Sequence, residues 1–220
     1  MGVGLVLRRI DPDWLAAAIE HGVAAGRRLG PPPPPMGLPW PRDVVFRLRH
    51  PLAPRSRGAW SGAYATRVFY PWQHALDTGS VESVVLGKSW YDFAVVSGAG
   101  GWAGERGRAA PPDAGPLARA VHGTHTPPDE MVSGLDFAVR YNTAEEVGRL
   151  SAALPEVDLE ARVAALDVDA LPPYDRPSWV EPDGTRHPDR VGLLLNTFGR
   201  LQGVYLRAAR EGQSVVCELG

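Results

Sequence analysis

The sequence predicts an α+β protein in which a small mixed sheet, containing the first and last strands of the chain, packs against several helices. Three observations lead to this prediction. Residues 3–10 and 214–219 are short apolar runs rich in Val and Leu, as expected of buried strands. Between them, residues 12–26 and 189–210 carry apolar side chains at helical spacing. At 220 residues, the chain is long enough to bury a core of its own as a single domain.

The first helix has a clear start. Asp11 is a good N-terminal cap and Pro12 suits the first helical position. Apolar side chains then follow one side of the helix, which should end near Gly26 or Gly30. His21 lies on this helix and is expected to be exposed or half-buried.

Residues 30–70 read as a Pro/Arg-rich insertion in the domain. Five consecutive prolines, residues 31–35, favour a polyproline II segment, which suits a stiff linker or a surface loop. The arginines and aromatic residues of positions 42–67 raise the possibility of nucleic-acid binding, but no nucleic-acid-binding fold signature accompanies them, so that reading is disfavoured. We expect a poorly ordered insertion that docks back through three aromatic side chains, Trp60, Phe69 and Trp72.

The segment from Val85 to Ser97 has apolar residues at spacings of three, four and seven, which predicts a helix, although its Val pairs would also suit strands. On such a helix, Lys88 and Asp92 lie four residues apart and could form an ion pair. Lys88 is the one lysine among 23 basic residues. The Gly-rich stretch that follows lacks the spacing of a dinucleotide fingerprint or a P-loop.

The C-terminal half predicts a regular series of elements. A short helix should run from Pro116 to Gly123, and residues 137–141 alternate as a strand does. The sequence Thr143-Ala-Glu-Glu146 is a capping box that opens a further helix. Helices over residues 158–166 and 189–210 follow. The last of these is expected to bury one row of apolar side chains: Val191, Leu194, Leu195, Phe198, Leu201, Tyr205 and Leu206.

Composition indicates an ordinary globular protein. The net charge of −2 provides no general attraction to nucleic acid or to membranes, and no apolar run approaches the length of a membrane span. The N-terminus lacks the charge order of a signal peptide. Cys217, the single cysteine, reads as a buried thiol in a reducing compartment, so we expect a cytoplasmic protein.

Taken together, these segments resemble the YfbM-like family, a bacterial domain of unknown function with an α+β fold. The resemblance covers residues 1–26 and 81–220 and leaves out residues 30–70. It implies the fold, and it implies no catalytic residue or cofactor. The matching segments are the N-terminal strand leading to Asp11, Leu86-Gly-Lys-Ser-Trp90, Pro116-Leu-Ala-Arg-Ala-Val-His-Gly123, Arg140-Tyr-Asn-Thr-Ala-Glu-Glu-Val147, Tyr174 followed by Trp179, and Tyr205-Leu-Arg-Ala-Ala-Arg-Glu-Gly212.

Two histidines are candidate metal ligands. His122 and His125 have a spacing that could place both imidazoles on one metal ion. However, Gly123 interrupts the helix between them, and no third ligand is evident apart from Asp129 or Glu130. Structural histidines are therefore favoured, with no metal and no cofactor. Neither Ser89 nor Ser97 lies in a nucleophile elbow, so a serine hydrolase is disfavoured as well.

The function favoured by these observations is non-enzymatic binding of a protein partner or a small molecule. Aromatic and polar side chains could line one cleft, as ligand sites require. The alternative is a small enzyme whose cleft holds Trp90, Asp92 and His122, which would need acid and base within hydrogen-bonding reach. The oligomeric state is left open. The candidate ligand-binding residues are Lys88, Trp90, Tyr91, Asp92, His122, His125, Tyr174 and Trp179.

Overall fold

The computed structural model describes residues 4–29, 57–87, 89–97, 110, 113–128, 138–169, 179–181, 184–185 and 187–219. The chain divides into two compact units, which are treated separately below. The sheet unit comprises Met1–Arg9, Glu82–Thr126 and Phe137–Gly220, and the helical unit comprises Ile10–Val81 and Pro127–Asp136. The expectation of one domain stays a prediction.

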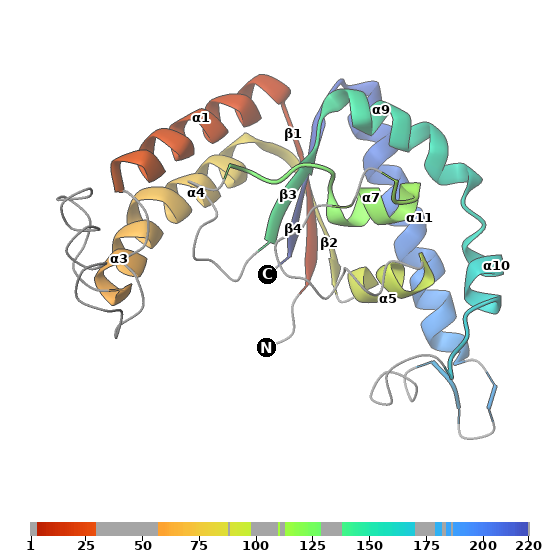
Figure 1. The fold of residues 1–220 in the computed structure, drawn as a ribbon. Coiled ribbons are helices and arrows are strands. Elements are labelled where there is room, and N and C mark those ends of the chain that lie inside the picture. The colour runs from red at the N-terminus through yellow and green to blue at the C-terminus, as the bar shows by residue number, and fades with distance from the viewer. Residues whose placement is uncertain are drawn as a thin grey trace. The chain divides into compact units, whose positions relative to one another are not determined.

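A four-stranded sheet with the order β2-β1-β4-β3 organises the sheet unit (Figure 1). The first and last strands of the chain are neighbours at its centre, which confirms the predicted α+β class. The sheet is antiparallel, whereas we expected it to be mixed. Its strands are β1 Leu5–Ile10, β2 Ser80–Gly87, β3 Ala138–Asn142 and β4 Ser214–Leu219.

Helices pack against this sheet and bury one apolar core with it. The long helix α11 packs along α9 (Figure 1), and its Leu194, Leu201 and Tyr205 are fully buried. Leu206 was expected to face the core as well, but it is 45% exposed. The helical elements of the unit are α5 Ser89–Val96, α7 Pro116–His122, α9 Ala144–Ala153, η2 Leu154–Glu156, α10 Leu159–Ala164 and α11 Pro188–Arg210.

Local sequence signals start two of these helices. The Thr143 hydroxyl accepts the Glu146 backbone N–H, and the Glu146 carboxylate accepts the Thr143 backbone N–H, so the predicted capping box is confirmed. Asp158 caps α10 by accepting the Ala161 N–H at 2.8 Å. Cys217 is buried as predicted, and burial raises the pKa of its thiol to about 12.

The predicted helix from Val85 is wrong at its beginning. Residues up to Gly87 belong to β2, whose side chains alternate between more and less exposed positions, and the helix α5 begins at Ser89. Gly87 has a φ of +60°, which turns the chain between strand and helix and which other residues rarely adopt. Val84 and Val85 therefore lie in a strand, the structure that β-branched residues favour.

Helices make up most of the described part of the helical unit, which also includes the last residue of β1 and the first two of β2. Trp14 in α1 donates its indole N–H to the Ala75 carbonyl at 2.9 Å, which ties α1 to α4. Leu15 and Ala18 of α1 are buried, and His21 is exposed, as the helical pattern predicted. The helices are α1 Pro12–Leu29, α3 Arg57–Tyr64, the π-helical segment η1 Ala65–Phe69, and α4 Tyr70–Gly79.

The expectation of a poorly ordered insertion is wrong for residues 57–70, which form helix. Of the three aromatic side chains predicted to dock, Trp60 and Trp72 are buried and Phe69 is half-buried. Trp60 stacks on Tyr64 with ring centroids 5.0 Å apart. The polyproline stretch and the rest of residues 30–56 lie outside the described residues.

In the part of the chain that the structure describes, no helix is both long enough and apolar enough to cross a membrane.

Candidate functional site

A cluster of buried polar side chains lies on the face of the sheet that meets α7 and α11. Asn142 on β3 donates to the Tyr205 hydroxyl at 2.7 Å and to the Arg119 carbonyl at 3.1 Å. Tyr205 in turn donates to the Ala120 carbonyl at 2.7 Å. These bonds pair polar groups that are cut off from water and join the strand to helix α7, so Asn142 and Tyr205 have a structural role.

Arg140 in the same cluster differs from its neighbours. It lies beside Cys217 in the β3–β4 register and is only 3% exposed. Burial lowers the pKa of its guanidinium to about 10, so the group is a buried cation at neutral pH. Its polar contact is a hydrogen bond from Nη1 to Nδ1 of His122, at 3.4 Å. Its buried Nε–H meets no acceptor, and no carboxylate within the described residues balances its charge.

His122 is held as a neutral imidazole. Arg140 has only donors, so Nδ1 of His122 must be the acceptor, which places the ring proton on Nε2. Burial lowers the pKa of His122 to about 3, and the positive charge of Arg140 acts in the same direction. Trp90 meets the imidazole edge-on, with ring centroids 6.2 Å apart. Because it is partly exposed, Trp90 gives the cluster an aromatic side chain that reaches the surface.

We expect His122 to make the fold sensitive to mild acid. Its pKa is about 6.5 in the unfolded chain and about 3 in the folded protein, so the unfolded chain binds the extra proton within that window. The free energy of unfolding should therefore fall by roughly 1.4 kcal/mol per pH unit as pH drops below 6.5. Urea unfolding between pH 5 and 6.5 measures this slope, above the range in which carboxylates titrate.

His122→Asn is the matched variant, because its side-chain oxygen can still accept from Arg140 and it does not titrate. Unfolding of the variant should take up about one proton fewer than unfolding of the wild type, so its unfolding free energy should depend less steeply on pH. This difference does not depend on the absolute stability of the variant. Equal slopes for the two proteins would show that His122 takes up a proton in the folded state.

Gly123 brings α7 close to β3 at this cluster. Its φ of 65° and ψ of 161° belong to a region that is open essentially to glycine alone. An added Cβ would lie 2.8 Å from the Cβ of Arg140 and 2.9 Å from the backbone N of Tyr141. The predicted stop of the helix at Gly123 is confirmed, and the residue also permits this close approach.

Gly123→Ala should lower the free energy of unfolding by at least about 2 kcal/mol, through backbone strain and the clash with β3. Gly148→Ala is the control, because its Cβ meets nothing within 4 Å on helix α9. That substitution should stabilise the protein by about 0.5–1 kcal/mol. Denaturant unfolding measures both, and a Gly123→Ala protein as stable as the wild type would contradict the close packing.

A second group of side chains surrounds Asp92, which lies next to the buried Phe93 in α5. Asp92 forms an ion pair with Arg190 of α11. The expected pair with Lys88 stays a prediction, because Lys88 lies outside the described residues. The Arg190 guanidinium lies over the Trp179 ring, 5.0 Å from its centroid, as in a cation–π contact. The Nε–H of Arg190 and the indole N–H of Trp179 are buried without an acceptor. Helix α5 therefore contributes one side chain to each of two clusters. Trp90 contacts His122 beside Arg140, and Asp92 pairs with Arg190 beside Trp179.

His125 belongs to a different environment from that of His122. Its Nε2 lies 2.9 Å from Glu146, and its ring stacks on Tyr141 with centroids 5.2 Å apart. Its side chain is 44% exposed, whereas His122 is buried. Within the described residues, no group of three or more His, Cys, Asp or Glu side chains could hold a metal ion.

The structure thus brings together part of the predicted residue set. Trp90 contacts His122, and Asp92 and Trp179 share Arg190 as a partner. Lys88 and Tyr174 lie outside the described residues, as does the side chain of Tyr91.

The most distinctive residue, Arg140, was missed, and so was Arg190. The alternation of the strand offered no signal for Arg140. If Phe137, Val139 and Tyr141 form the apolar face of this strand, the alternation predicts that Arg140 faces solvent. In the structure Val139 and Arg140 are both buried, so both faces of β3 are covered. Arg190 lies in the first turn of the predicted long helix, 98 residues from Asp92, and nothing local connects the two.

Comparison with known proteins gives the family. A model of a domain of unknown function, DUF1877, matches residues 1–217. The chain belongs to the DUF1877 family. The match confirms the resemblance found from the sequence, and its range also spans residues 30–70. No curated protein matches the chain. A solved structure of YfbM from Escherichia coli, a protein of unknown function, is similar to this DUF1877 chain over 99% of both chains, with a TM-score of 0.51 and 13% identity. At that identity the similarity is one of fold.

Proposed function

We propose that this DUF1877 chain is a non-enzymatic binding domain that holds a small monocarboxylate at Arg140. The observation that carries the proposal is a buried guanidinium with no carboxylate partner and a buried Nε–H with no acceptor. An uncompensated cation in a protein interior costs several kcal/mol, and such groups cluster at functional sites. A bound carboxylate would supply the missing charge and acceptor together.

The charge of the surroundings favours a monoanion. His122 is neutral and contributes no second positive charge, so one guanidinium would face one carboxylate. Trp90 offers an aromatic surface beside the imidazole for an apolar part of the ligand. The wider prediction, binding of either a protein partner or a small molecule, is thereby narrowed to a small molecule. A cytoplasmic location stays a prediction.

The alternative enzymatic role has less support from this geometry. An imidazole whose pKa is near 3 is a weak proton acceptor at neutral pH, and Asp92 is engaged by Arg190. The contacts therefore favour holding a ligand over transferring a proton.

Binding of acetate and benzoate tests the proposal. Calorimetric titration and thermal unfolding of the wild type should show saturable binding of at least one carboxylate, and none of benzamide, the uncharged counterpart of benzoate. Arg140→Met should abolish it. Arg149→Met is the control, because Arg149 is an exposed arginine of the same unit that pairs with Glu145. Equal effects of benzoate and benzamide, or carboxylate binding that survives in Arg140→Met, would rule out this site.

A further inference from the structure

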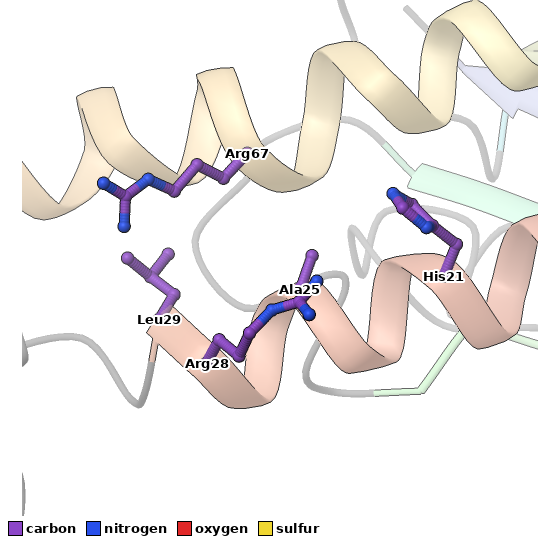
Figure 2. Close-up of a pocket in the computed structure, with 5 residues that line it drawn as sticks. All are labelled: His21, Ala25, Arg28, Leu29 and Arg67. Carbon is purple, nitrogen blue, oxygen red and sulfur yellow. The ribbon is translucent and has the colours of Figure 1, made fainter.

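The helical unit contains a cavity of about 290 Å³ between α1 and the π-helical segment η1. Its volume lies at the lower end of the range of about 300–1,000 Å³ that is usual for ligand pockets. Figure 2 shows five described residues that line it, four on α1 and one, Arg67, on the facing helical segment. They are His21, Ala25, Arg28, Leu29 and Arg67.

The polar lining of this cavity is basic. His21, Arg28 and Arg67 line it, and no acidic side chain is among the lining residues that the structure describes. Within the described part of the chain, these three side chains make no ion pair or side-chain hydrogen bond, unlike the neighbouring Arg27, which has a partner. The guanidinium charges of Arg28 and Arg67 repel each other across the cavity, and an anion bound between them would remove that repulsion.

The positions of these groups follow from the two backbones. His21, Ala25 and Arg28 recur every three or four residues along α1, so their side chains share one face of the helix. Arg67 comes from η1, five residues of π-helix between α3 and α4. A π-helical turn is rare and occurs frequently at functional sites, because its wider turn re-aims the side chains that it carries. Figure 2 shows the Arg67 side chain extending toward the end of α1 that carries Leu29.

The residues that line the cavity suit a phosphate group. Two guanidinium groups can each donate paired hydrogen bonds to a phosphate, and an imidazole N–H can supply another. Two arginines would balance the two charges of a phosphomonoester. Ala25 and Leu29 add an apolar wall for the organic part of such a ligand.

We propose that this cavity binds a small phosphomonoester, with the phosphate held between Arg28 and Arg67 and with His21 as a third donor. The site does not depend on Arg140 or on the carboxylate proposed there. A pocket of this size suits a compact metabolite with a terminal phosphate.

Calorimetric titration with ribose 5-phosphate tests the site, with ribose as the uncharged control. The wild type should bind the phosphate ester saturably and should not bind ribose. Arg28→Gln and Arg67→Gln should each weaken binding at least tenfold. Both side chains are exposed, so these variants should fold as the wild type does, which thermal unfolding checks. Arg67→Lys keeps the charge without the paired donors and should bind with intermediate affinity.

Two control variants separate this site from other causes. Arg149→Gln removes the same charge from an exposed position in the sheet unit and should bind as the wild type does. Arg140→Met should also bind ribose 5-phosphate normally, so that the two proposals can fail independently.

The proposal is overturned if ribose 5-phosphate does not bind saturably, or if the Arg28 and Arg67 variants bind it unchanged. It is also overturned if a short oligothymidylate binds through these arginines and ribose 5-phosphate does not compete. That result would indicate a nucleic-acid surface.

Discussion

Arg140→Met is expected to raise the free energy of unfolding by about 1–3 kcal/mol, because it replaces a buried cation without a carboxylate partner by an apolar side chain of similar length. Arg140 is 3% exposed and its Nε–H has no acceptor, so the folded protein bears the desolvation cost of the charge. The one hydrogen bond that is lost, to His122, offsets about 1 kcal/mol of the gain.

Urea unfolding at pH 7 in a carboxylate-free buffer measures the effect of this substitution. The expected pattern is a gain in stability together with loss of carboxylate binding, as at sites where function has been kept at the expense of stability. A fall in stability of more than about 1 kcal/mol would mean that the Arg140 charge is compensated within the fold, and the binding proposal would lose its basis.

Arg9→Met should have the opposite effect and lower the free energy of unfolding by about 2–4 kcal/mol. Arg9 is also a buried arginine of the same sheet, with its side chain 5% exposed. Each of its nitrogens has a partner: Nε donates to Gln213 at 2.8 Å, and Nη1 and Nη2 donate to Glu82 and Glu211 at 2.7 Å each. This guanidinium joins β1, β2 and the segment that enters β4.

Arg207→Met provides the comparison for Arg9. Arg207 also pairs with Glu82, at 2.8 Å, but its side chain is 46% exposed. Its loss should cost less than about 1 kcal/mol, as for most exposed ion pairs. Urea unfolding of both variants decides the matter. If Arg9→Met were no more harmful than Arg207→Met, the three-way contact would not exist in solution.

The pairing of polar groups could be predicted only where both partners lie close together in the chain. The capping box of Thr143 and Glu146 was predicted because its two residues are three positions apart and belong to one helical turn. The prediction of a Lys88–Asp92 pair rested on the same short spacing, and Lys88 lies outside the described residues. The observed pair of Asp92 with Arg190 joins residues that are distant in sequence, and local spacing holds no information about such a contact.

The sequence by itself determined the family, the α+β class, and the beginning and end of helices such as α11 and α7. Those features depend on apolar periodicity, caps and glycine stops, which act within a few residues. The tertiary structure alone decided which charged groups are buried and whether they are paired. Burial of Arg140 requires cover on both faces of β3, and pairing of Arg9 with Gln213 joins residues 204 positions apart. Both depend on packing between distant segments, so a buried arginine that stabilises this fold and one that is available for a ligand look alike in the sequence.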